Sequence, residues 1–186
     1  MKSDAIIRKS VADILRAVGE DPTREGLRDT PKRVASLYRD IFSGIGVDPV
    51  EAIDTVFEEE HQGAVILKDV SFFSTCEHHL LPFFGVAQMG YVPMGRVAGA
   101  SKLVRALDVV SRRPQLQERM TSQLADAICT ALKPAAAAVV LEAEQLCMVM
   151  RGVRRPGSKV VTTAIRGPFA ESETSPQELL SMMQRG

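Results

Sequence analysis

The sequence of 186 residues has no tryptophan and contains only three cysteines and three histidines. Three cysteines at irregular spacing, in a chain of medium size, do not form the kind of disulfide framework that holds small secreted domains together. We therefore expect the cysteines to be reduced thiols or metal ligands.

The sequence also lacks an excess of charge of either sign and a long hydrophobic run. Its 23 lysines and arginines balance its 23 aspartates and glutamates, so there is no basic surplus of the kind that holds nucleic acid. No apolar run approaches the roughly 20 residues that a membrane-spanning helix needs. We expect a cytoplasmic protein that binds neither nucleic acid nor a membrane. The apolar fraction of 45% is ample for a folded core.

One segment, STCEHHLLPFFG at residues 74–85, contains one of the three cysteines and two of the three histidines within four consecutive positions. Cys76 and His79 have C-x-x-H spacing, which lets two side chains of one tight turn reach a single ion. Cysteine and histidine are the usual protein ligands of zinc and related transition metals. The segment therefore predicts a metal site.

The remaining cysteines and the third histidine differ in their sequence context. Cys129 lies in an apolar helical pattern, which favours a small buried side chain, and His61 follows three glutamates, which favours exposure to solvent. Cys147 lies at the end of a predicted strand, just before a basic loop, and spacing alone leaves open whether it is a third ligand. If it is, no fourth protein ligand is evident, and an open position for water is typical of a catalytic site.

His78 is not needed as a ligand, because it is adjacent to His79. Histidine is a common general acid or base in enzymes, so His78 is a candidate for that role, and the alternative is a hydrogen-bonded histidine of the turn.

Hydrophobic periodicity predicts a mixed order of helices and strands. We expect helices over residues 6–18 and 30–43, strands over 64–75 and 83–93, helices over 101–113 and 114–133, strands over 137–150 and 158–167, and a last helix that begins with a capping box at Ser175. This order indicates an α+β domain in which helices cover one face of an antiparallel sheet.

Six segments carry a resemblance to a known family. They are DTPKRVA, STCEHHLLPFFG, ASKLVR, RRPQLQERMTSQ, LCMVMRGV and TTAIRG, spread from Asp29 to Gly167. The sequence resembles GTP cyclohydrolase I. The resemblance implies an N-terminal helical portion over residues 1–60, a catalytic domain with the tunnelling fold over residues 61–186, and a toroidal homodecamer with active sites at subunit interfaces. It also implies a zinc ion held by Cys76, His79 and Cys147.

The resemblance further implies a reaction and a set of roles. GTP is hydrolysed at C8 of the guanine imidazole ring to a formamidopyrimidine triphosphate, and loss of formate, rearrangement of the ribose and ring closure give 7,8-dihydroneopterin triphosphate. His78 would handle a proton on the purine. The matching positions are Arg33, Lys102, Arg105 and Arg151 for the triphosphate, Gln117 and Glu118 for the guanine edge, and Ser101 for the ribose rearrangement. Taken one by one, these residues have simpler interpretations, namely surface charges, the polar face of a helix and, for Ser101, a helix N-cap.

Two positions depart from the family pattern. Two residues before the third ligand the family usually has histidine, whereas this sequence has Gln145, which cannot act as a general acid or base. Two interpretations remain: another group substitutes and the pterin forms, or the reaction stops after ring opening. Ser36 stands where some members carry a lysine near the triphosphate. Gln145 is also what favours the alternative function, a non-catalytic oligomeric relative that binds a purine or pterin.

Overall fold

The computed structural model describes residues 2–61, 63–168 and 174–184. The chain divides between Ser43 and Gly44 into two compact units. The first unit is a pair of helices, α1 (Lys2–Ala17) and α2 (Thr30–Ile41), which confirms the two predicted N-terminal helices. Pro31 lies in the first turn of α2, where its missing N–H costs no intrahelical hydrogen bond. An ion pair between Arg39 and Asp4, at 2.8 Å, joins the two helices.

The second unit begins earlier than the predicted boundary at residue 60. Gly44 N donates to Arg112 O at 2.9 Å, and Ile53 is buried in the core of the second unit. A side chain at Gly44 would collide with the backbone, because a Cβ there would lie 2.1 Å from Val109 O. Residues 44–55 contain no helix or strand, so periodicity did not reveal that they pack with the second unit.

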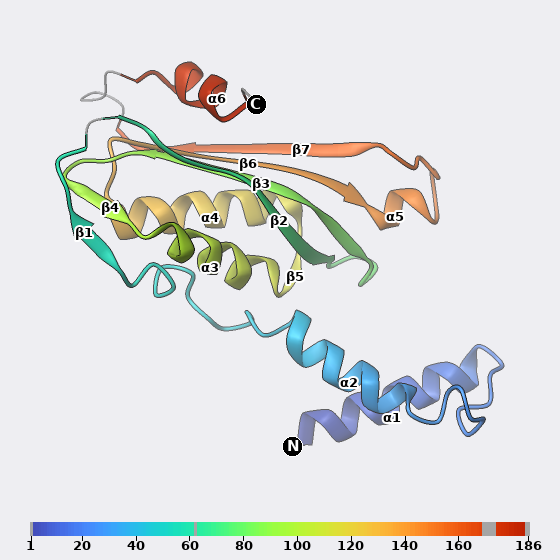
Figure 1. The fold of residues 1–186 in the computed structure, drawn as a ribbon. Coiled ribbons are helices and arrows are strands. Elements are labelled where there is room, and N and C mark those ends of the chain that lie inside the picture. The colour runs from blue at the N-terminus through green and yellow to red at the C-terminus, as the bar shows by residue number, and fades with distance from the viewer. Residues whose placement is uncertain (1, 62, 169–173, 185–186) are drawn as a thin grey trace. The chain divides into compact units, whose positions relative to one another are not determined.

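A five-stranded sheet organises the second unit (Figure 1). Its order is β5 (Pro114–Gln115), β2 (Val65–Cys76), β3 (Pro82–Val92), β6 (Ala136–Gln145) and β7 (Lys159–Arg166). Neighbouring strands are antiparallel except for the short pair β2 and β5. A separate antiparallel pair is formed by β1 (Val56–Glu58) and β4 (Arg96–Ala98). The predicted antiparallel α+β architecture is confirmed.

Helices α3 (Ala100–Ser111) and α4 (Gln117–Leu132) cover one face of this sheet (Figure 1). The main core lies between them and the strands and includes Phe72, Phe83, Met89, Leu107, Leu124, Ile128 and Leu141. Among the described residues, no helix is both long and apolar enough to span a membrane.

The last helix, α6 (Pro176–Gln184), packs on the opposite face of the sheet, so the prediction that helices cover one face was wrong for this element (Figure 1). Successive residues of a strand point to opposite faces. In β6 this places Val139 in the core under α3 and α4, and Ala138 in a second cluster with Leu179 and Met183 of α6. The apolar run 135–141 therefore reflects a strand that is covered on both sides.

The start of α6 agrees with its sequence pattern. Ser175 N donates to Glu178 Oε2 at 2.8 Å, and Glu178 N donates to Ser175 Oγ at 3.2 Å. These reciprocal hydrogen bonds are a capping box, as predicted.

The strand predicted over residues 137–150 ends at Gln145. Residues Leu146–Val149 form a single helical turn, α5, which is closed by a hydrogen bond from Met150 N to Leu146 O. Cys147 therefore lies on a helical turn and not on a strand, because the chain turns away from β3 as soon as its pairing ends at Gln145 and Phe83.

Candidate metal centre

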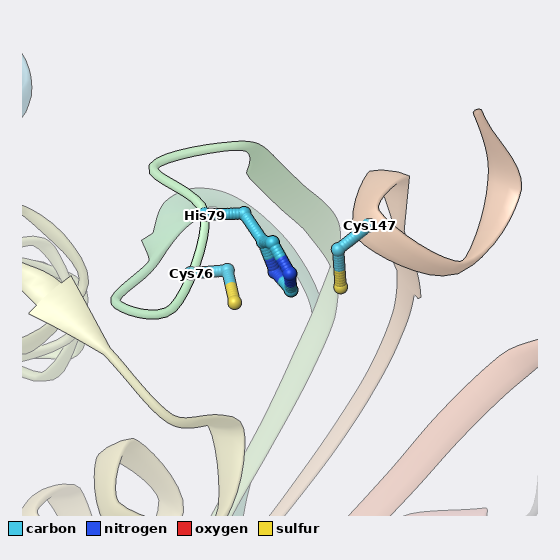
Figure 2. Close-up of side chains that lie close together, drawn as sticks. All are labelled: Cys76, His79 and Cys147. Carbon is cyan, nitrogen blue, oxygen red and sulfur yellow. The ribbon is translucent and has the colours of Figure 1, made fainter. Parts of the chain in front are cut away.

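Three side chains that can bind a metal converge at one end of the sheet (Figure 2). Cys76 is the last residue of β2, His79 lies in the turn between β2 and β3, and Cys147 lies on α5. Their ligand atoms all lie within 4.8 Å of one another. The pairing of Phe83 with Gln145 explains this convergence, because it brings the end of β6 beside the turn that carries the first two ligands.

The turn after Cys76 is closed by its own backbone. Cys76 N donates to Leu81 O at 2.8 Å, and Leu80 N donates to Cys76 O at 2.9 Å. Leu80 has a φ of 53°, in the left-handed region that a non-glycine residue rarely adopts. The backbone of Glu77 is held as well, since its N–H donates to Gln115 O at 3.0 Å. These bonds fix the path of the chain between Cys76 and His79.

The donor set fits a metal ion of the zinc type. Two thiols and one imidazole are ligands that zinc prefers, and among the described residues no fourth histidine, cysteine or carboxylate joins the group. Burial raises the pKa of the Cys147 thiol, and the neighbouring Cys76 raises it further. Two thiolates this close together need a cation to stabilise their charge, which is what a bound metal provides.

Arg151 lies directly against this group. Its Nη1 is 2.7 Å from His79 Nε2. The guanidinium is always protonated and can only donate, so His79 Nε2 is the acceptor in this contact. A residue predicted to bind triphosphate is thus placed beside a predicted metal ligand.

His78 lies in the same turn, with an exposed side chain. Its ring makes an edge contact with the ring of His79, with centroids 6.2 Å apart. His78 is not part of the ligand group formed by Cys76, His79 and Cys147. It therefore lies next to the candidate metal centre, with its side chain exposed.

Gln145 and Gln117 are joined by a hydrogen bond of 2.7 Å from Gln145 Nε2 to Gln117 Oε1. Gln117, the first residue of α4, is only 3% exposed. Its Nε2 lies 3.1 Å from Leu141 O, 2.9 Å from Val160 O and 3.2 Å from Thr162 Oγ1. Both ends of the Gln117 carboxamide are therefore bonded within the chain.

Residues 7–184 match the sequence profile of a family described as GTP cyclohydrolase I. This chain belongs to the GTP cyclohydrolase I family. It is 54% identical to GTP cyclohydrolase 1 of Streptococcus pyogenes serotype M1 over 177 residues, which cover 95% of this chain and 91% of that protein. It is equally similar, at 54%, to GTP cyclohydrolase 1 of Halalkalibacterium halodurans over 179 residues, which cover 96% of this chain and 95% of that protein.

A third relative gives the same result. GTP cyclohydrolase 1 of Geobacillus kaustophilus is 54% identical over 181 residues, which cover 97% of this chain and 96% of that protein. Among solved structures, the archaeosine synthase QueF-Like in the apo form covers 59% of this chain and 97% of its own, with a TM-score of 0.46 and 19% sequence identity. A likeness at that level carries no functional argument, so the sequence relatives define the family.

The other residues that resemblance to the GTP cyclohydrolase I family singled out lie on α2, α3 and α4. Ser101, Lys102 and Arg105 lie in the first two turns of α3, and Lys102 Nζ is 2.5 Å from Asp54 Oδ1. Ser101 is not the N-cap of α3, because the helix begins at Ala100 after Gly99.

Glu118 has an exposed side chain in the first turn of α4, and Arg33 is a residue of α2 in the first unit. The roles of these α2, α3 and α4 residues stay predictions.

Four residues that contact the predicted site residues or their neighbours were not predicted from the sequence, namely Glu77, Arg119, Thr121 and Thr162. Arg119 pairs with Glu77, next to the candidate ligand Cys76, through contacts of 2.6 and 3.1 Å. Thr121 and Thr162 extend the hydrogen bonds of Gln117. Nothing in their local sequence signals these contacts, since each joins residues about 40 positions apart in the chain.

Proposed function

We propose that this chain is a zinc-dependent GTP cyclohydrolase, a hydrolase that opens the guanine ring of GTP at C8. The observation that carries the proposal is the convergence of Cys76, His79 and Cys147 beside an exposed His78, in a chain that belongs to the GTP cyclohydrolase I family. A protein that only binds a purine or pterin would have no need of this ligand group. The non-catalytic alternative is therefore not favoured.

Cys76, His79 and Cys147 would hold the zinc ion. When bound, zinc would act as a Lewis acid that lowers the pKa of water toward neutrality and so makes a nucleophile available for C8. The ordered turn after Cys76 supports the position of two ligands, and α5 supports the third. Three protein ligands would leave the fourth position of a four-coordinate zinc ion for water.

His78 would move a proton on the purine. Its neighbour His79 is the ligand, so both ring nitrogens of His78 stay available, and an imidazole exchanges protons near neutral pH. Its exposed position allows contact with a bound nucleotide. Addition of water across C8 requires proton transfer to a ring nitrogen, and His78 is the group we assign to that step.

Four cations would bind the triphosphate: Arg33, Lys102, Arg105 and Arg151. Arginine suits phosphate because its planar fork gives paired, charge-assisted hydrogen bonds. Arg151 contacts His79, so a phosphate bound by Arg151 would lie close to the metal ligands. Lys102 is paired with Asp54 and would have to share or leave that carboxylate when it binds phosphate.

Glu118 would bind the guanine edge, since an exposed carboxylate can accept from the N–H groups of the base. We assign Gln117 to the same part of the site, with its amide held inside the chain by the bonds described above. Ser101 would serve the later rearrangement of the ribose. These assignments are supported by the match of each position to the family motifs.

We also propose a ring-shaped homodecamer with active sites at subunit interfaces. The sheet ends in a long edge strand, β7, whose outer backbone groups are unpaired within the described chain. Edge strands favour pairing with another chain, and closure into a barrel removes the edges. Such an assembly would let residues of neighbouring chains complete one site.

The proposed function is tested by incubating zinc-loaded protein with GTP and identifying the products by mass spectrometry. We expect loss of GTP and a product that contains one added water, a formamidopyrimidine triphosphate, or the compounds that follow from it. Unchanged GTP in the presence of protein that retains about one zinc per chain would contradict the proposed activity.

A further inference from the structure

The orientation of the buried Gln117 carboxamide is imposed by its surroundings. Its Nε2 faces two backbone carbonyl oxygens, Leu141 O and Val160 O, which can only accept hydrogen bonds. The nitrogen end must therefore point toward β6 and β7. In a flipped amide, Gln117 Oε1 would face these two carbonyl oxygens, and no hydrogen bond could form. Gln117 Oε1 consequently points the other way, as an acceptor that needs a donor.

Two threonines, Thr121 and Thr162, continue the hydrogen-bond network of Gln117. Thr121 Oγ1 is 2.7 Å from Gln117 O, a backbone carbonyl oxygen, so the single hydroxyl hydrogen of Thr121 is donated to it. The 2.6 Å contact between Thr121 Oγ1 and Thr162 Oγ1 then requires Thr162 to donate. Thr162 Oγ1 also lies 3.2 Å from Gln117 Nε2, whose two hydrogens are shared among this oxygen and the two carbonyl oxygens. Each bond of this network has one possible direction, because carbonyl oxygens lie where it ends.

The network requires a hydrogen-bond donor at residue 145. Gln117 Oε1 can be satisfied only by a donor, and Gln145 Nε2 lies 2.7 Å away. Leu141 and Ala143 of β6 belong to the core under α3 and α4, and Gln145 continues this row two residues on, beside the start of α4. Because the nitrogen of Gln145 is committed to Gln117, its amide oxygen is left as an acceptor. Within the described part of the chain that oxygen has no hydrogen-bond partner.

We propose that Gln145 is a positioning residue: its donor bond to Gln117 holds its amide oxygen as a fixed acceptor for an N–H or O–H group of the purine nucleotide. The second half of this inference rests on the proposed function. Gln145 lies two residues before the ligand Cys147, at the N-cap position of α5, so the acceptor lies at the edge of the metal centre. Glutamine thus reproduces the donor and acceptor pattern of a neutral imidazole without its ability to move a proton.

The inference is tested with three substitutions in the zinc-loaded protein: Gln145→Glu, Gln145→Met and Gln145→His. Glutamate matches glutamine in shape but places an acceptor against Gln117 Oε1, methionine offers neither group, and histidine can supply both. Gln177→Glu, on an exposed part of α6, controls for the added negative charge. The measurements are zinc content, melting temperature, and KM and kcat for GTP.

We expect Gln145→His to keep the wild-type melting temperature and a KM within about threefold of the wild type. Gln145→Met should raise KM about tenfold, because one hydrogen bond and its orientation are lost. Gln145→Glu should be the least stable variant, with a melting temperature lower by about 2–6 °C and a KM at least as high as that of Gln145→Met. A role in packing alone predicts the opposite order, with Gln145→Glu the mildest because it is isosteric.

Wild-type stability and KM in Gln145→Glu would overturn the proposed positioning role. A wild-type KM in Gln145→Met would overturn the acceptor assignment, even if its melting temperature fell. If the wild-type protein binds GTP without consuming it, the proposed function fails, and the same variants are then compared by calorimetric GTP binding. If the wild type binds no GTP at all, the stability order alone decides whether the donor bond to Gln117 is as we propose.

Discussion

The guanidinium of Arg119 makes two hydrogen bonds with the carboxylate of Glu77, at 2.6 and 3.1 Å. This pair joins the residue after the predicted ligand Cys76 to the first turn of α4, the helix that begins with Gln117. The turn that carries the predicted ligands Cys76 and His79 and the predicted guanine-binding residues are therefore connected by side chains as well as by the sheet.

The Arg119–Glu77 pair makes stability depend on pH. The hydrogen bond from Arg119 holds the pKa of Glu77 below its ordinary value of 4.5. A carboxylate with a lowered folded pKa contributes stability above its unfolded pKa, and the contribution disappears as the pH falls through the folded pKa. We expect Glu77→Gln to be less stable than the wild type at about pH 7, and we expect this difference to shrink as the pH falls below 4.5 and to vanish once Glu77 is protonated in the folded protein. Urea unfolding of chelator-treated protein measures this difference without a contribution from zinc.

Arg119→Met provides the matched comparison, because it removes the same ion pair from the other side. The double variant should lose little more than either single one. Both partners are substantially exposed, so the expected effect is small. A difference between Glu77→Gln and the wild type that persists unchanged in acid would show that the ion pair is not its cause.

The second prediction concerns the metal ligands. Cys147→Ser should reduce bound zinc from about one per chain to a small fraction and abolish turnover, because a serine hydroxyl is a poor zinc ligand. The fold should largely persist, since Cys147 lies on α5, beyond the end of β6, and is only partly buried. Zinc content by elemental mass spectrometry and circular dichroism measure the two effects.

Cys129→Ser is the control for loss of a thiol. Cys129 lies in α4, outside the group of three, and burial raises the pKa of its thiol, as expected of an inert cysteine. This variant should keep its zinc. The ligand assignment would be untenable if Cys147→Ser retained zinc fully.

The third prediction is the size of the assembly. We expect light scattering at micromolar concentration to report a homodecamer, about ten times the mass of the 20.3 kDa chain. The physical reason is the exposed edge of β7, which another chain would cover. A monomer under these conditions would contradict the proposal of interface sites.

The fourth prediction concerns how far the reaction proceeds. Ring opening needs a nucleophile and a proton donor, which the zinc site and His78 can supply, whereas later steps need transfers that Gln145 cannot make. We expect the protein to convert GTP to the formamidopyrimidine triphosphate and to form dihydroneopterin triphosphate slowly. Gln145→His should speed pterin formation by roughly a hundredfold or more, the usual effect of a general acid or base. Fluorescence after oxidation measures the pterin.

Ring opening itself should change little in Gln145→His, and this serves as the internal control. If the unaltered protein forms dihydroneopterin triphosphate as fast as the histidine variant, Gln145 is a tolerated substitution and the reaction does not stall.

Features encoded within a few residues could be predicted from the sequence. The capping box of Ser175 and Glu178, the start of α2 at Thr30 and Pro31, and the C-x-x-H pair of Cys76 and His79 all depend on contacts within one or two turns of chain. For such contacts the spacing of residue types already determines which side chains meet. The family motifs are local in the same sense.

The tertiary structure decided whatever depends on strand register. Cys147 joins Cys76 because β3 and β6 pair until Phe83 meets Gln145, a relation between residues 62 positions apart. The same register aligns Gln145 with the buried amide of Gln117 and commits its nitrogen as a donor. The apolar run 135–141 specified burial but not that α6 would cover the second face, because a strand apolar on both sides does not identify its partners.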